Sequence, residues 1–280
     1  RPDGTFVTVP LNIHRLNNLF YNQEVVDQAG VDPTGVETPS DLVEILEAVD
    51  SETDAAPMAH QTQSPWTTLQ LWAQVLLGEH GVAAYESFTA GDVGQVETEI
   101  KNALDIVTRY KDYFNEDAGS VSWTEANQKV IEGGAAFMHQ GDWAAGAYRG
   151  ADGFEFDTHW NQVPYPGTDG MYALNMDSFP YPNNNPSPDA TTKFLRYCGS
   201  TDGQKQFNPR KGSIPPRTDV STDPFGPFLT RQIDDFANSE AQPLSIQHGL
   251  AIAPEKRSNL VNAFSTFIAN WNVDEAYSAI

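Results

Sequence analysis

The chain has 280 residues, of which 39% are hydrophobic, so it is long and apolar enough for one large domain or two packed lobes. The 38 acidic residues outnumber the 16 basic ones and give a net charge of -22, which repels nucleic acid and anionic membranes. We therefore expect no nucleic-acid partner. We attribute the acidic surface to adaptation to concentrated salt, in which screening weakens its self-repulsion.

The sequence lacks the motifs of several kinds of structural and catalytic site. Cys198 is the single cysteine, so a disulfide framework is excluded. The histidines lack the spacing of a zinc site, and the sequence contains neither a phosphate-binding loop with lysine nor a nucleophile elbow. No run of about 18 apolar residues predicts a membrane span. We expect no metal and no cofactor.

The first half of the chain alternates short strand patterns with helix patterns. Alternation of apolar and polar residues predicts the first strand, and apolar residues at helical spacing predict the helices. In order, we expect a strand over 7–13, an apolar run over 19–22, a helix ending at Gly30, a helix starting at 38–41, a loop over 51–63, a helix starting near Trp66, a connector over 85–94 and a helix over 100–114.

The stretch from Ser122 to Tyr148 contains the most distinctive local signals. Ser122 and Glu125 have the spacing of a capping box, and a glycine pair at 133–134 ends the helix that they open. A buried strand follows at 135–138, and Asp142 is the expected cap of the next helix. This order places Trp123 and Trp143 at loop edges, where they either line a cleft or fill gaps in the core.

The second half is predicted to be mainly helical. The expected elements are a strand over 171–179, a proline-rich hinge candidate over 180–188, a helix over 190–197, a second helix capped by Thr201, a rigid loop over 211–216, a helix over 227–236, an exposed polar loop over 245–249 and a final helix through residues 260–268. Helices outnumber the short strands that they separate, which favours α/β lobes.

The remaining polar and aromatic candidates suit binding better than catalysis. Indole faces stack on the C–H faces of a sugar ring, and charged groups bond to its hydroxyls. Candidates of these two kinds stand at element ends or in loops: Trp66, Trp123, Trp143, His14, Asp177, Lys211 and His248. No nucleophile–base relay is evident. A glycoside hydrolase remains the alternative, because paired carboxylates lie far apart in sequence and acidic residues are plentiful.

The order of the motifs resembles that of solute-binding proteins of carbohydrate ABC transporters. The similarity covers nearly the whole chain and is nearest to the glucose/mannose-binding branch, with maltose-binding proteins as more distant relatives. The motifs that carry it are VPLNIHR at 9–15, FYN at 20–22, TPSDL at 38–42, WTEA at 123–126, GGAAFM at 133–138, GDWA at 141–144 and KGSIP at 211–215.

This resemblance implies an α/β, class II periplasmic-binding-protein-like fold with two lobes joined by hinge strands. The family normally has about a hundred residues ahead of the crossover, so we expect an incomplete N-terminal lobe. The implied divisions are an N-lobe remnant with a crossover strand at 1–13, the first part of the C-terminal lobe at 14–174, an N-lobe portion with the hinge at 175–222 and closing helices of the C-terminal lobe at 223–280.

The resemblance also gives each candidate side chain a role. Trp123 and Trp143 would contact the sugar from the C-terminal lobe, while Asp177 and Lys211 would reach its hydroxyls from the opposite side. His248 would close the cleft. His14 would lie near the crossover, and Trp66 matches a position where the family often places an aromatic contact.

The implied function is capture of a monosaccharide such as glucose outside the cell and delivery to the membrane permease of an ABC transporter. The protein would be a monomer at the cell surface, anchored through a segment absent from this chain. A receptor for another solute, such as a polyol phosphate, is a further alternative. Arg210 and Lys211 offer it only a thin supply of cations.

Overall fold

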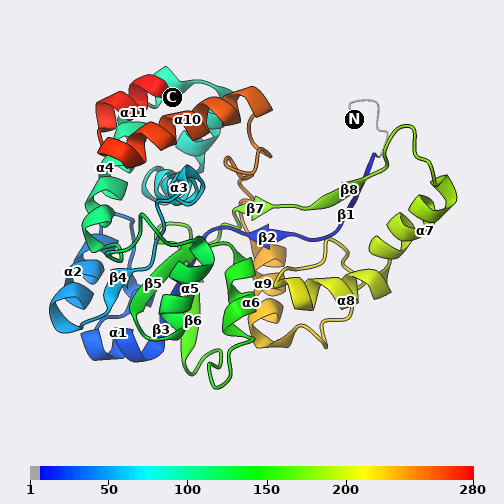
Figure 1. The fold of residues 1–280 in the computed structure, drawn as a ribbon, viewed down its shortest axis with the longest axis horizontal. Helices are drawn as coiled ribbons and strands as arrows, with labels where there is room; N and C mark the ends of the chain where they lie inside the picture. Colours follow the sequence, from blue (N-terminus) through cyan, green and yellow to red (C-terminus); the bar gives the residue numbers. More distant parts are fainter. Residues whose placement is uncertain (1–6) are drawn as a thin grey trace.

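The structure is a computed structural model that describes residues 7–280. The first six residues of the predicted N-lobe remnant lie outside this range. A large body of sheet and helices occupies one side of the molecule (Figure 1). An arm extends from it and consists of β1 (Thr8–Pro10), β8 (Ser178–Pro180), α7 (Pro188–Cys198) and α8 (Thr201–Lys211). The α/β class predicted from the sequence is confirmed.

A four-stranded sheet forms the centre of the body. Its strand order is β4 (Ala56–Met58), β5 (Ala135–Gln140), β3 (Asn18–Asn22) and β6 (Trp160–Pro164). β3 pairs antiparallel with β5 and β6, whereas β4 runs parallel to β5. The prediction of a loop over 51–63 missed β4, because a three-residue strand has too few residues to establish a period of its own.

Both faces of this sheet are buried. Leu19 and Tyr21 of β3 pack into one hydrophobic cluster and Phe20 packs into another, as the two-residue period of a strand requires. The larger cluster involves α1 (Gln23–Ala29), α2 (Leu42–Glu52), α3 (Pro65–Ala90), α4 (Glu97–Tyr110), α10 (Pro254–Asn270) and α11 (Val273–Ala279). The smaller cluster involves α5 (Trp123–Ile131), α6 (Ala145–Tyr148) and α9 (Gly226–Asn238).

α3 is longer than predicted, so the expected connector over 85–94 is wrong. The helix continues to Ala90 through a kink at Gly81, whose φ of 76° and ψ of 179° are non-helical. Tyr85 and Phe88 beyond the kink are buried. The kink shifts the apolar stripe of the helix, so the sequence pattern does not continue in register across it.

The chain crosses between arm and body three times, on two extended segments that pair with each other and through the link at 212–225 between α8 and α9. β1 (Thr8–Pro10) pairs antiparallel with β8 (Ser178–Pro180) in the arm, and β2 (His14–Arg15) pairs with β7 (Leu174–Asn175) nearer the body. The single strands predicted over 7–13 and 171–179 are therefore each interrupted. Between the paired parts, the backbone N–H of Leu11 donates to the Asp177 carbonyl.

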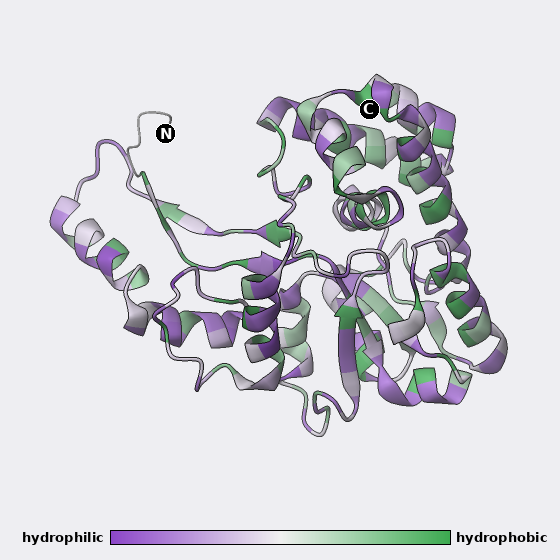
Figure 2. Ribbon diagram, turned by 180° about the vertical axis from the view of Figure 1, so that it is seen from behind, coloured by the Kyte–Doolittle hydropathy of each residue, from purple (hydrophilic) through white to green (hydrophobic). Residues whose placement is uncertain are grey.

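The rest of the arm consists of α7 (Pro188–Cys198) and α8 (Thr201–Lys211). Ser200 rather than Thr201 caps α8, because its hydroxyl accepts the Gly203 N–H. Segment 180–188 joins β8 to α7 at the outer end of the arm (Figure 1). Apolar segments lie along the strands of the arm and along α7 (Figure 2). The exposed aromatic residues of the arm are Phe179, Tyr181, Phe194, Tyr197 and Phe207.

The predicted exposed loop over 245–249 is largely buried. Ser245 and Gln247 are each 1% exposed. The Gln247 amide donates to Gln70 of α3 at 2.9 Å, and Gln70 in turn donates to Gln140 of β5 at 3.0 Å. Because its polar groups find partners inside the body, this hydrophilic segment does not need solvent.

Within residues 7–280, none of the helices combines the length and the apolar character needed to cross a lipid bilayer.

Candidate functional site

One pocket lies where the body meets the crossing strands. It has a volume of about 250 Å³, and all seven candidate residues from the sequence line it, together with Asn175. They come from separate elements: His14 from β2, Trp66 and Trp123 from the first turns of α3 and α5, Trp143 from a short 3-10 turn, Asn175 from the end of β7, Asp177 from the β7–β8 link, Lys211 from the end of α8 and His248 from the loop before α10.

Three of the lining rings surround Trp143. The Trp143 centroid lies 5.0 Å from His14, 5.6 Å from His248 and 6.1 Å from Trp66. The two histidines meet the indole nearly edge-on, at 84° and 78°. These contacts form an aromatic wall on one side of the pocket.

The ends of two elements position the indoles. A capping box between Ser122 and Glu125 fixes the first turn of α5, so Trp123 stands at its first position as predicted. Trp143 lies two residues after Gly141, and a Cβ atom on Gly141 would collide with the Trp143 indole ring. Gly141 therefore permits the orientation of Trp143.

Asp142 corrects a sequence prediction. It is not the cap of the following turn, because Gly141 occupies that position. The Asp142 side chain is fully buried; it accepts a hydrogen bond from His14 Nδ1 and another from the Arg15 backbone N–H at 3.1 Å. Aspartate is a preferred N-cap residue, and the sequence alone does not show that the fold places His14 beside Asp142.

Two donors converge on one oxygen of Asp177. Asn12 Nδ2 lies 2.9 Å from Asp177 Oδ2, and His14 Nε2 lies 3.4 Å from the same atom. The Asp177 N–H also donates to Asn12 Oδ1 at 2.9 Å. Asp177 is 46% exposed, so its carboxylate remains accessible from the pocket.

The charges of this group are interdependent. Burial by itself lowers the pKa of His14, but attraction to Asp142 and hydrogen bonds to both carboxylates raise it to about 9. The hydrogen bond from His14 holds the pKa of Asp177 well below its usual range. Burial raises the pKa of Asp142, against the opposing effect of His14.

His248 differs from His14. Burial and repulsion from His14 lower its pKa to about 4, so it is neutral near pH 7. Its Nδ1 lies 2.7 Å from the Ser245 hydroxyl. One wall histidine is thus a cation and the other a neutral ring.

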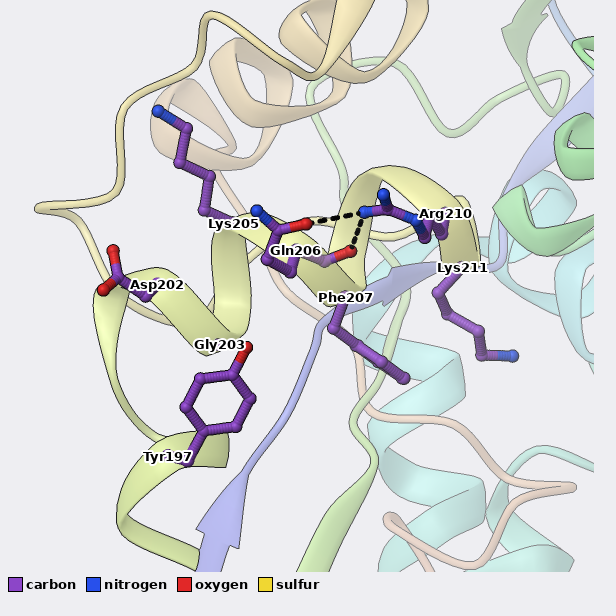
Figure 3. Close-up of a pocket in the computed structure, with 8 residues that line it drawn as sticks. All are labelled: Tyr197, Asp202, Gly203, Lys205, Gln206, Phe207, Arg210 and Lys211. Carbon is purple, nitrogen blue, oxygen red and sulfur yellow. Dashed lines mark hydrogen bonds between the residues drawn. The ribbon is translucent and has the colours of Figure 1, made fainter. Parts of the chain in front are cut away.

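Lys211 also borders a second hollow, of about 800 Å³, along α8 (Figure 3). Figure 3 shows Phe207 and Lys211 projecting from one side of the helix, while Lys205 extends in another direction. Tyr197 and Phe207 line this hollow and are exposed. It is a wide, open surface of the arm rather than an enclosed pocket.

Three polar residues of this region were not predicted as site residues from the sequence: Asn12, Asp142 and Asn175. A signal existed for two of them. Asn12 falls on the polar face of the predicted first strand beside His14, and Asn175 shares a face with Asp177. Within residues 7–280, no group of three or more His, Cys, Asp or Glu side chains is arranged to hold a metal ion.

An α/β body is thus joined by crossing strands to an arm, with a pocket of aromatic and polar side chains at the junction. The chain belongs to the bacterial extracellular solute-binding protein family, whose model matches residues 1–230. This is a family of solute receptors and not of enzymes.

The curated relatives include sugar receptors. The chain is 40% identical over 274 residues to the xylose/arabinose-binding protein XacG of Haloferax volcanii, an alignment that covers 97% of this chain and 59% of that protein. It is 29% identical over 255 residues to a probable sugar-binding periplasmic protein of Brucella suis, covering 89% of this chain and 59% of the relative. The chain thus spans about three fifths of their length.

Solved structures share the fold. The bacterial solute receptor AcbH superposes with a TM-score of 0.83 at 14% identity, covering 99% of this chain and 70% of that one. A chitin oligosaccharide binding protein gives a TM-score of 0.83 at 17% identity, with the same coverage. The predicted solute-binding-protein fold is confirmed.

Proposed function

We propose that the pocket binds a neutral sugar and that the whole protein delivers this sugar to the permease of an ABC importer. The observation that carries the proposal is that eight side chains from separate elements line one pocket, with an aromatic wall beside hydrogen-bonding groups. Rings of this kind suit the apolar faces of a saccharide, and Asp177, Asn175 and Lys211 suit its hydroxyls.

The candidate ligands are monosaccharides. A volume of about 250 Å³ has room for one sugar ring. The motif resemblance favours glucose, whereas the relative at 40% identity is named for xylose and arabinose. We therefore place the two pentoses first and glucose next. A polyol phosphate is less favoured, because Lys211 is the one cation among the pocket-lining residues apart from the histidines.

We further propose that the arm is part of a second lobe that closes over the sugar. A two-stranded sheet with exposed aromatic residues is a marginal unit by itself, which supports a larger lobe in the whole protein. The crossing segments near Leu11 and Asp177 would then serve as the hinge, and the sugar would favour closure through contacts made only in the closed state. The receptor would act outside the cell, as an anchored monomer.

A thermal-shift panel in concentrated KCl tests the proposal. D-xylose, L-arabinose or D-glucose should raise the melting temperature in a dose-dependent way, because a ligand that binds only the folded state stabilises it. A phosphorylated polyol should have no effect. Stabilisation by the phosphate alone, or turnover of an aryl glycoside, would contradict the assignment to a neutral-sugar receptor.

A further inference from the structure

Asp142 lies behind the pocket, and the ring of His14, which lines the pocket, separates it from the open surface. Asp142 is fully buried and His14 is 1% exposed. Asp142 is not among the residues that line the pocket. Its two oxygens are held by His14 Nδ1 and by the Arg15 backbone N–H, so its carboxylate cannot turn toward a ligand without breaking a buried hydrogen bond.

The orientation of the imidazole follows from this anchor. With Nδ1–H directed at Asp142, the opposite edge of the ring presents Nε2 to Asp177 Oδ2 at 3.4 Å. The Asn12 amide donates to the same oxygen, and its nitrogen lies 3.0 Å from His14 Nε2. An imidazolium shares Asp177 Oδ2 with this amide, whereas a neutral His14 would accept from Asn12 at Nε2, so the charge of His14 decides between the two arrangements. The Trp143 indole packs against the imidazole at nearly a right angle, with 5.0 Å between the ring centroids.

We propose that Asp142 is a positioning residue for sugar binding: it holds His14 as a buried cation that, with Asn12, anchors Asp177 through Oδ2 and presents Oδ1 to the sugar. This inference rests on the proposed function of the pocket. Asp142 would thus support binding without touching the ligand. The charges of Asp142, His14, Asp177 and Lys211 also sum to zero, which explains why the pocket would prefer a neutral ligand.

The charged and titratable groups that face His14 come from four elements. Asp142 from the turn after β5 and Asp177 from the β7–β8 link favour the cation. Lys211 at the end of α8 opposes it. His248, from the loop before α10, is near enough for His14 to lower its pKa. The two carboxylates prevail over burial and over Lys211, so the imidazolium persists through neutral pH.

The test uses Asp142→Asn, with Asp117→Asn as the matched control. The control removes a half-exposed carboxylate that pairs with Lys129 at 2.8 Å on the surface. The ¹⁵N shifts of His14, recorded at pH 8 without sugar, report its charge directly. We expect an imidazolium in the wild type and in Asp117→Asn, and a neutral ring in Asp142→Asn. A neutral His14 in the wild type would overturn the proposal without any variant having to fold.

Binding of D-xylose, followed by NMR titration at pH 8, gives the second readout. Asp142→Asn should weaken binding by about tenfold, as expected for the loss of a charge-assisted hydrogen bond, while Asp117→Asn should not. Wild-type affinity in Asp142→Asn with a neutral His14 would refute the positioning role and leave the sugar-receptor assignment intact. If D-xylose, L-arabinose and D-glucose all fail to bind the wild type, the proposed function fails, and the positioning role with it; the ¹⁵N shifts still report the charge of His14.

Discussion

Gly141 determines where the Trp143 indole lies, although a glycine has no side chain with which to bind anything. A Cβ atom at this position would occupy the space of the indole six-membered ring. The backbone at Gly141 has a φ of -67°, which any residue adopts, so the requirement is space and not conformation.

Gly141→Ala should therefore displace Trp143 and weaken sugar binding. We expect a loss of about 1–3 kcal/mol of binding free energy, the range for a displaced aromatic anchor. NMR titration with D-xylose measures it. Gly146→Ala is the control, because a Cβ there meets no atom within 4 Å. Equal affinities of the two variants would show that Trp143 is not an anchor.

His60 and His139 make the stability of the body sensitive to acid. Both are buried in the body, and burial lowers the pKa of each to about 3. Their ring nitrogens lie 3.0 Å from the Thr68 hydroxyl and 3.1 Å from the Leu16 carbonyl. In the unfolded chain these rings take up protons near their usual pKa of 6.5, so protonation favours unfolding.

The free energy of unfolding should fall as the pH drops below about 6.5, by about 1 kcal/mol per histidine between pH 6 and pH 5. Urea unfolding in concentrated KCl measures it. The double variant His60→Gln/His139→Gln should lose less stability over the same interval. An identical pH slope in variant and wild type would rule out these two rings as the cause.

At the scale of elements, locally encoded features were predicted and those set by tertiary contacts were not. The capping box at Ser122 and the glycine end of α1 at Gly30 are confirmed, because a few adjacent residues define them. β4 and the far half of α3 were missed, since β4 is defined by pairing with residues distant in sequence, chiefly those of β5. Asp142 illustrates the same limit within the site.

The kink in α3 offers a direct test of an element. At Gly81 the φ of 76° and ψ of 179° lie in a region that is essentially restricted to glycine, and a Cβ there meets no atom within 4 Å. Gly81→Ala should therefore destabilise the fold through backbone strain alone, by about 1–3 kcal/mol. Urea unfolding gives the value.

Gly94→Ala is the matched control for Gly81→Ala. Gly94 also has open space around its Cβ position but no positive φ. We expect its stability to stay near that of the wild type. Equal stabilities of the two variants would mean that the helix passes Gly81 without a kink.

At the scale of the whole molecule, the net charge of -22 destabilises the folded state through repulsion among the acidic side chains. We propose that the protein works in concentrated salt, which the match to a Haloferax volcanii receptor supports. Raising KCl from about 0.1 M to about 2 M should increase the melting temperature, because stronger screening weakens the repulsion among the surface carboxylates. A melting temperature that is unchanged or lower at high salt would contradict this adaptation.

Most of the residues that line the pocket could be predicted from the sequence, whereas the arrangement of the lobes could not. Its tryptophans stand at recognisable element starts, and the motif order supplied the polar partners, so all seven candidates line one pocket. Their roles in binding are still predictions. The arrangement of the arm depends on residues far apart in sequence, such as the Ile13 N–H that donates to the Ile214 carbonyl.

The most direct test of a sugar site is the indole N–H spectrum of the six tryptophans during a titration with D-xylose, L-arabinose or D-glucose, with assignments from single Trp→Phe variants. The signals of the pocket residues Trp66, Trp123 and Trp143 should shift together and saturate. Those of the packing residues Trp72, Trp160 and Trp271 should stay in place. No shift with any of the three sugars, or shifts confined to the packing tryptophans, would contradict the proposal that this pocket binds a sugar.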